Sequence, residues 1–209
     1  MTDIVEEADR VHRETGTRRV TAGEARTVLV RRVFDAEVGD VWEAVTSADQ
    51  LGRWFLPVGG ELRAGGRYRL EGNAAGEILV CEPPRRLRVS WLAGPDPGFS
   101  EVELRLAPDG AGRTVLELEH VAVVPEEFWT RFGPGAAGVG WDLMLLGLGL
   151  HLAGTGSGAQ AADWATSPVA REFIRRSGEA WGAAYAASGA DAAVVAATTA
   201  AAIGFYAQT

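Results

Sequence analysis

Several short runs in the middle of the chain alternate apolar and polar residues with a period of two. They are RYRLEG (67–72), GEILVCE (76–82), RRLRVSWL (85–92), SEVELRLA (100–107) and RTVLELEHVAV (113–123). This alternation is typical of strands that face a core on one side and solvent on the other. Glycine, proline and Asp-Gly signals separate the runs, so the pattern predicts a meander of antiparallel strands. An earlier run rich in β-branched residues, TVLVRRVF (27–34), predicts a further strand.

Strand parity divides the predicted meander into a charged face and an apolar face. The charged face carries Arg88, Glu101, Glu103, Arg105, Glu117 and Glu119. The apolar face carries Tyr68, Leu70, Leu87, Val89, Trp91, Val102, Leu104, Leu106, Leu116, Leu118 and His120. A sheet of this kind has one solvated face, and its other face needs a cover.

The stretch GVGWDLMLLGLGLHLAG (138–154) predicts the helix that covers this face. It is too short and too interrupted for a membrane span, which needs about 20 apolar residues. One stripe at helical spacing faces the sheet in this interpretation, namely Trp141, Met144, Leu145, Leu148 and Leu152. A second stripe, Leu143, Leu146 and Leu150, requires another cover. Gly147 and Gly149 cost helix stability, which indicates either close packing of the tail or space left for a cavity.

The two ends of the chain suggest additions to this central unit. Apolar residues Ile4, Ala8 and Val11 predict an amphipathic helix within an N-terminal helical extension over 1–25. The central domain is expected over 26–153, with a helix or helix pair over VWEAVTSADQLGRW (41–54) and a linker GTGSGA (154–159). Aromatic residues punctuate the alanine-rich sequence that follows. We therefore expect a C-terminal helical extension over 159–209 that packs on the second leucine stripe.

Successive segments of the chain resemble a known superfamily. The segments are VRRVFDAEVGDVWEAVT, LGRWFLP, LRAGGRYRLEG, GEILVCEPPRRLRVSW, SEVELRLAPDGAGRTVLELEH and VGWDLMLLGLGLHL. In this order they resemble the SRPBCC (START or Bet v-like) superfamily, in its branch of homologues of the activator of heat-shock-protein-90 ATPase, and the extensions look like those of actinobacterial members. The resemblance implies an α+β helix-grip fold, in which a curved antiparallel sheet wraps a long C-terminal helix around an apolar cavity.

Charge and composition limit the kinds of molecule that the chain is expected to bind. A net charge of -8 and a pI near 5.0 disfavour nucleic acid and anionic membranes, since both attract basic surfaces. The single Cys81 permits no internal disulfide, and the charged start of the chain is unlike a secretory signal, which together favour a cytoplasmic protein. The three histidines lie far apart without ligand-spaced neighbours, so neither a metal nor another cofactor is expected.

The apolar face and the covering helix define a candidate ligand site. We expect a cavity lined by Tyr68, Val89, Trp91, Leu118, His120, Trp141, Met144, Leu145 and Leu148, with Trp54 and Phe55 near its mouth. His120 or Tyr68 would orient a polar group of the ligand. For each, core filling is the structural alternative. Arg32 and Glu77 are a further possible buried pair, although parity in their strands is ambiguous.

These residues leave three functions open. The first is binding of a small hydrophobic molecule, as a carrier or sensor. The second is a cyclase or lyase on an aromatic or polyketide-like substrate, with His120 and Tyr68 as acid and base, although the chain shows neither paired carboxylates nor a catalytic triad. The third is a cochaperone-type protein interaction, for which the charged face offers no specific sign. The sequence ranks them in this order.

Overall fold

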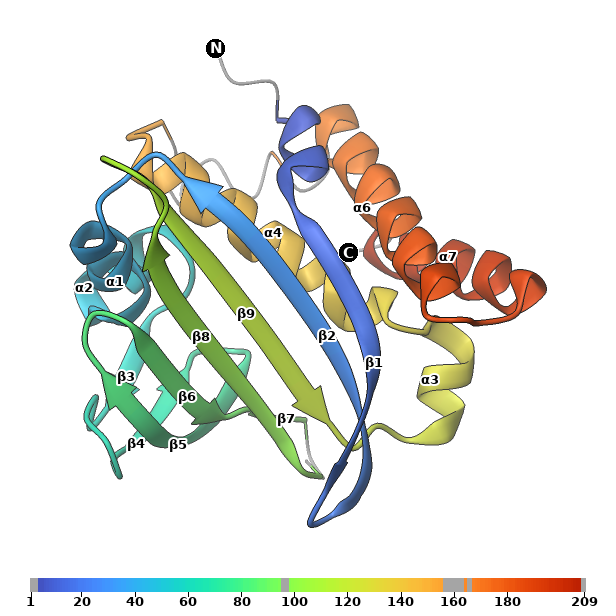
Figure 1. Ribbon diagram of the computed structural model, residues 1–209, viewed down its shortest axis with the longest axis horizontal. Helices are drawn as coiled ribbons and strands as arrows, with labels where there is room; N and C mark the ends of the chain where they lie inside the picture. The colour runs from blue at the N-terminus through green and yellow to red at the C-terminus, as the bar shows by residue number, and fades with distance from the viewer. Residues whose placement is uncertain (1–3, 95–97, 156–163, 165–166, 208–209) are drawn as a thin grey trace.

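The computed structural model describes residues 4–94, 98–155, 164 and 167–207 (Figure 1). Within them, nine strands form one antiparallel sheet in the order β1-β2-β9-β8-β6-β5-β4-β3, with β7 paired to β5. The strands are β1 (His12–Val20), β2 (Gly23–Phe34), β3 (Val58–Gly60), β4 (Arg67–Leu70), β5 (Ala74–Glu82), β6 (Arg86–Ser90), β7 (Leu92–Ala93), β8 (Ser100–Pro108) and β9 (Thr114–Ala122). The predicted antiparallel meander is therefore confirmed.

The helices pack on the concave side and at the ends of this sheet (Figure 1). They are the 3-10 helix η1 (Glu6–Arg10), α1 (Val38–Thr46), α2 (Ala48–Trp54), α3 (Glu126–Phe132), α4 (Gly135–Leu152), α6 (Pro168–Ala187) and α7 (Ala192–Ala207). The sheet curves around α4, with α1 and α2 at one end and α6 and α7 beside α4 at the other. This is the expected α+β helix-grip arrangement with added C-terminal helices. The region predicted as one helix or a pair over 41–54 is a pair that breaks at Ser47.

The expected N-terminal helix is largely wrong. Only Glu6–Arg10 is helical, and from His12 the chain is a strand that pairs with β2 from His12↔Arg31 to Val20↔Gly23. The apolar spacing of Ile4, Ala8 and Val11 is compatible with a helix. However, pairing along the free edge of β2 satisfies more backbone groups than a short exposed helix would. The extension is thus mainly a strand of the central sheet.

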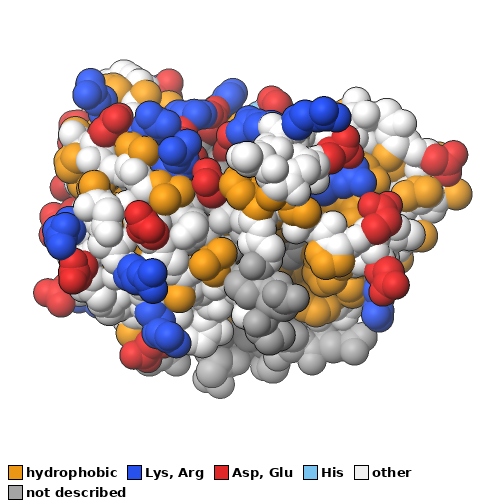
Figure 2. All heavy atoms as spheres, turned by 90° about the horizontal axis from the view of Figure 1, so that it is seen from below, with side chains coloured by type: hydrophobic (Ala, Val, Ile, Leu, Met, Phe, Trp, Pro, Cys, Tyr) orange, Lys and Arg blue, Asp and Glu red, His pale blue; other side chains and the backbone are white. Residues whose placement is uncertain are grey.

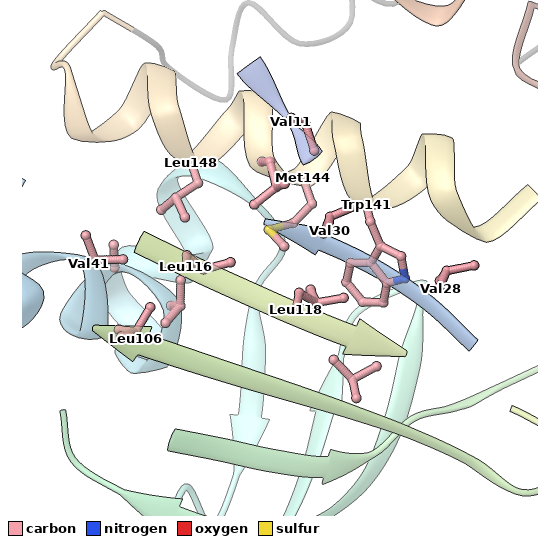
Figure 3. Close-up of a cluster of buried hydrophobic side chains, with 14 of the residues drawn as sticks. Val11, Val28, Val30, Val41, Leu106, Leu116, Leu118, Trp141, Met144 and Leu148 are labelled. Carbon is pink, nitrogen blue, oxygen red and sulfur yellow. The ribbon is translucent and has the colours of Figure 1, made fainter. Parts of the chain in front are cut away.

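Helix α4 lies in the concave face of the sheet, and its two apolar stripes have different covers. Figure 3 shows Trp141, Met144 and Leu148 directed from α4 toward the sheet, where Leu116 and Leu118 of β9 lie. On its other side, Leu146 packs in a second cluster with Ala8 and Phe173. The partly buried Leu143 and Leu150 border that cluster, so the predicted second stripe does face the tail, but η1 shares in covering it.

The glycines of α4 mark close approaches by large side chains. A Cβ at Gly138 would lie 2.1 Å from the indole of Trp181, which is fully buried. Gly149 faces the guanidinium of Arg32, and Gly147 faces Trp54. The two reasons proposed from the sequence for Gly147 and Gly149 are therefore wrong, because the neighbours are an α2 tryptophan and a β2 arginine rather than the tail or open space.

A buried carboxylate joins the N-terminal strand, the central helix and the tail. Asp142 on α4 has no exposed surface, and its Oδ2 accepts from Arg13 Nε at 2.9 Å and from Trp181 Nε1 at 3.1 Å. The hydroxyl of Ser177 on α6 donates to the same oxygen. Burial raises the pKa of the Asp142 carboxyl, and the Arg13 charge opposes that rise. One side chain of α4 therefore ties both extensions to the central unit.

Arg32 forms a second buried pair, with Glu7 of η1 rather than with Glu77 as considered from the sequence. Its Nη1 also donates to the Leu145 carbonyl at 3.0 Å. Glu77 is exposed, because it lies on the outer side of β5. The expected linker GTGSGA (154–159) and the expected start of the tail at residue 159 lie wholly or partly outside the described residues.

Among the described residues, α4 has the length and apolar composition of a membrane-crossing helix. Half of it is buried inside the fold, which is the usual situation of a core helix. Its position between sheet and tail accounts for the apolar character that stands out in the sequence.

Candidate functional site

A cavity of about 120 Å³ lies between α4 and the inner face of the sheet, next to α1 and α2. Residues of β4, β5, β6, β8 and β9 form one wall, and in β4, β6 and β8 they alternate as strand parity predicts. Nearly all of the lining is apolar or aromatic. It consists of Val45, Thr46, Leu51, Trp54, Phe55, Val58, Leu62, Tyr68, Leu70, Ile78, Cys81, Leu87, Val89, Trp91, Val102, Leu104, Leu118, Trp141 and Met144.

Eight of the eleven residues predicted for this site surround the cavity, namely Trp54, Phe55, Tyr68, Val89, Trp91, Leu118, Trp141 and Met144. Leu145, Leu148 and His120 do not. Leu145 and Leu148 are fully buried in the core, and Figure 3 shows Leu148 directed toward α1 near Val41. Helical spacing alone places them on the same stripe as Trp141. It carries no information that α1 fills the space against the C-terminal half of α4.

The prediction missed residues of two kinds. Leu70, Leu87, Val102 and Leu104 lie on the face that strand parity identifies as apolar, so the sequence does carry a signal for them. The residues from α1, α2 and the β3 region carried no signal that would place them at the cavity. Ile78 and Cys81 both face it, although three positions apart, because the register of β5 shifts between Ile78 and Val80. A bulge of this kind breaks the alternation on which parity depends.

The aromatic wall is built around Trp141. Its ring centroid lies 5.1 Å from that of Trp91, with planes tilted by 58°. On its other side the edge of His120 approaches, with 5.6 Å between centroids and 87° between planes. These are favourable aromatic geometries that hold flat surfaces against the cavity.

His120 lies behind this wall and holds it in place. Trp141 Nε1 donates to His120 Nδ1 at 3.2 Å, so Nδ1 carries no proton. In the neutral imidazole the proton is then on Nε2, which donates to Ser100 Oγ at 2.9 Å. Burial lowers the pKa of His120 to about 4, so the ring is neutral at physiological pH. His120 is therefore a positioning residue for Trp141, and the prediction that it lines the cavity is wrong.

With this geometry, comparison with known proteins becomes informative. The model of the family "Activator of Hsp90 ATPase homolog 1-like protein" matches residues 35–152, which is more than half of the chain. The chain belongs to this family. The resemblance seen in the sequence is thereby confirmed.

Solved structures extend the likeness of this chain to known proteins. The crystal structure of CalU16 from Micromonospora echinospora is 40% identical, with 83% of this chain and 97% of CalU16 covered and a TM-score of 0.65. The solution NMR structure of CalU16 is 39% identical, covers 85% and 96%, and has a TM-score of 0.69. The crystal structure of MLL2253 from Mesorhizobium loti is 27% identical, with 63% and 99% covered and a TM-score of 0.53. Comparison with curated proteins gives no match.

The family match spans α1 to α4 and so contains every residue that lines the cavity. It leaves out β1, β2, α6 and α7. The likeness to CalU16 covers 83% of the chain and therefore extends beyond the family region into these added elements. The cavity therefore lies within the region that the family model matches, and the likeness to CalU16 reaches beyond that region.

Most polar side-chain atoms around the cavity already form hydrogen bonds within the protein. The Tyr68 hydroxyl donates to the Ser90 carbonyl at 2.8 Å, and burial raises the pKa of that hydroxyl above its ordinary value. Trp54 Nε1 donates to the Ala44 carbonyl at 2.9 Å, and Thr46 Oγ1 donates to Trp42 at 2.7 Å. These groups offer a ligand little polar recognition, so the cavity selects for apolar shape.

Leu51 and Trp54 of α2 line one part of the cavity, and α2 buries none of its residues completely. Trp54 at its C-terminal end stacks on Phe55, with 5.4 Å between centroids, and on His151 of α4 at 6.2 Å. Gln50 of α2 bonds His151 Nε2 at 2.9 Å. Trp54 also packs against Gly147 of α4, where a Cβ would lie 3.4 Å from its ring. Two side chains of α2 thus fasten it to the end of α4.

His120 and Tyr68, the acid and base considered from the sequence, both form internal hydrogen bonds. His120 has both ring nitrogens engaged, and the Tyr68 hydroxyl donates its proton to the Ser90 carbonyl. In the described part of the chain, no three His, Cys, Asp or Glu side chains gather as metal ligands would. The acid and base roles considered for His120 and Tyr68 therefore lack support from the geometry.

Proposed function

We propose that this chain binds a small, neutral, hydrophobic molecule in the cavity between α4 and the sheet, as a carrier or sensor. The observation that supports this most directly is the combination of an apolar, aromatic lining with polar groups that are satisfied internally. A charged ligand would lose its hydration here without gaining a partner. A flat apolar ligand has no strong hydration to lose and would contact the rings of Trp91 and Trp141.

The volume sets the size of ligand. A cavity of about 120 Å³ is comparable to engineered cavities near 150 Å³ that remain dry and bind benzene. If it were empty it would cost about 3 kcal/mol, at ~24 cal/mol per Å³. This cost is smaller than the free energy of unfolding of a typical domain. The volume therefore favours a ligand with a single aromatic ring. Larger ligands would require α2 to move outward.

The two other functions are not favoured by a specific observation in the described residues. The cyclase or lyase alternative loses its proposed acid and base, as described above. A cochaperone-type interaction is consistent with the family, but no surface feature here points to a chaperone. A cytoplasmic location and the absence of nucleic-acid partners remain predictions from charge and sequence.

Binding can be tested with indole, toluene and naphthalene as probes. We expect each that fits to raise the melting temperature and to quench tryptophan fluorescence, because Trp54, Trp91 and Trp141 surround the cavity. Native mass spectrometry of the purified protein would show whether a molecule is retained. The absence of any thermal shift, quenching or retained molecule would contradict the proposal.

A variant in which a larger side chain fills the cavity provides the control. Val89→Phe adds a ring at a lining position of β6 and should abolish probe binding while leaving the protein folded. Val33→Phe makes the same change at an exposed position of β2 and should leave binding intact. Probe binding that survives Val89→Phe would place the binding site elsewhere on the molecule.

A further inference from the structure

A second apolar feature lies on the outer surface, where α3 meets α7. Phe128 of α3 is 44% exposed and Phe205 of α7 is 45% exposed, although both are large aromatic side chains. Their rings lie 5.0 and 5.4 Å from that of Phe132, so the three phenylalanines form one contiguous cluster. Figure 2 shows hydrophobic side chains gathered on the side of the molecule that carries these helices. We call this surface, consisting of Phe128, Val194 and Phe205, the α3/α7 patch.

Helix α7 makes this patch unusual for an acidic protein. Its sixteen residues include no charged side chain, and only Thr198 and Ala202 are fully buried. A helix that is apolar on all sides is normally covered. The exposed Val194 and Phe205 instead face solvent along a helix about 24 Å long, at 1.5 Å per residue. Contiguous apolar exposure of this kind marks interaction surfaces.

The charged side chains beside the patch are arranged so that those of one copy could pair with those of a second copy. Glu127 and Arg131 lie one turn apart on α3 and flank Phe128. Neither forms an ion pair with another described residue, whereas the neighbouring Glu126 is paired with Arg26 at 3.5 Å. The Arg131 guanidinium only rests on the Phe132 ring, 4.8 Å from its centroid. An acidic and a basic group therefore stand at opposite ends of one exposed turn.

We propose that the α3/α7 patch is the interface of a weak, reversible homodimer with two-fold symmetry. An antiparallel pairing of α3 with its copy brings Glu127 opposite the partner subunit's Arg131, and by symmetry Arg131 opposite the partner subunit's Glu127. The exposed phenylalanines then cover each other between these pairs. Such a surface is complementary to itself, which is what a two-fold interface requires.

The net charge of the chain makes this face suitable for a second copy. Two molecules that each carry -8 repel one another over most of their surfaces. The α3/α7 patch offers an uncharged area beside Glu127 and Arg131 of α3, with Asp191 at the start of α7. The patch is small beside the roughly 800 Å² per partner of a stable complex. We therefore expect association only at high protein concentration.

Sedimentation velocity of the full chain over a concentration series tests the proposal. We expect the sedimentation coefficient to rise from that of a monomer toward that of a dimer, and Phe128→Ser to hold the protein monomeric. Arg131→Glu places like charges opposite one another and should weaken the dimer about tenfold. Arg67→Glu, the same charge change at an exposed position of β4, should leave association unchanged.

The swapped variant Glu127→Arg/Arg131→Glu distinguishes a two-fold interface from a general charge effect. It exchanges both groups and restores both pairs, so association should return to that of the original chain. A protein that stays monomeric at all concentrations, or a dimer indifferent to Phe128→Ser and Arg131→Glu, would overturn the proposal. So would co-sedimentation with phosphatidylcholine vesicles that Phe128→Ser abolishes, because the patch would then be a membrane contact.

Discussion

Protonation of His120 should control the stability of the protein in mildly acidic solution. Burial lowers the pKa of this side chain to about 4, against an ordinary value of 6.5. Between these two values the unfolded chain binds a proton that the folded chain does not. Stability from this group is therefore fully present above pH 6.5 and is lost as the pH falls toward 4. Between pH 7 and pH 4 the free energy of unfolding should fall by about 3 kcal/mol from this group, at ~1.4 kcal/mol per pKa unit.

Urea unfolding at a series of pH values measures this directly. Near pH 5.5 the contribution of His120 should change by about 1.2 kcal/mol per pH unit, which is well above the error of the method. His120→Gln is the matched control, because an amide can accept from Trp141 and donate to Ser100 but does not titrate. The difference between the two curves removes the contribution of carboxylates that titrate in the same range.

The tryptophans give a second readout. Protonation of His120 in the folded protein removes the acceptor for Trp141 Nε1, so Trp141 fluorescence of the folded protein should change only as the pH approaches 4, below most of the range in which the stability falls. Parallel stability curves for the original chain and His120→Gln between pH 7 and pH 4.5 would refute the reasoning. In that case His120 would titrate normally, and the Trp141 indole would be positioned by packing alone.

Other predictions concern the way in which the extensions and the central helix hold together. Deletion of 159–209 exposes the apolar surface around Leu146 and should give an aggregating or unfolded protein; a monomer with an unchanged melting temperature would remove the tail from the core. Asp142→Ala leaves the Arg13 charge buried without its partner and should cost about 3–5 kcal/mol in urea unfolding; a cost below 1 kcal/mol would contradict this role. Gly138→Ala places a methyl group against Trp181 and should lower the melting temperature strongly. Gly147→Ala meets Trp54 at an ordinary 3.4 Å and should be neutral or stabilising by up to about 1 kcal/mol. Equal effects of the two variants would contradict the difference in packing between these positions.

Much of the central unit was readable from the sequence because its signals are local. Strand parity depends only on the backbone period of two, and so it correctly collected Tyr68, Val89, Trp91 and Leu118 on one face. The length and apolar character of α4 likewise identified the helix that covers them. Eight of the eleven predicted residues surround the cavity for this reason.

The tertiary structure decided what depends on partners distant in the chain. His12 to Val20 is a strand because the edge of β2 was free to pair with it, which no pattern within those residues shows. His120 has the parity of a lining residue, yet the bulk of Trp141 separates it from the cavity. Asp142, Arg13 and Ser177 meet only because three separate elements pack on one another. A period reports which face a side chain takes, whereas the contacts on that face depend on packing across the whole molecule.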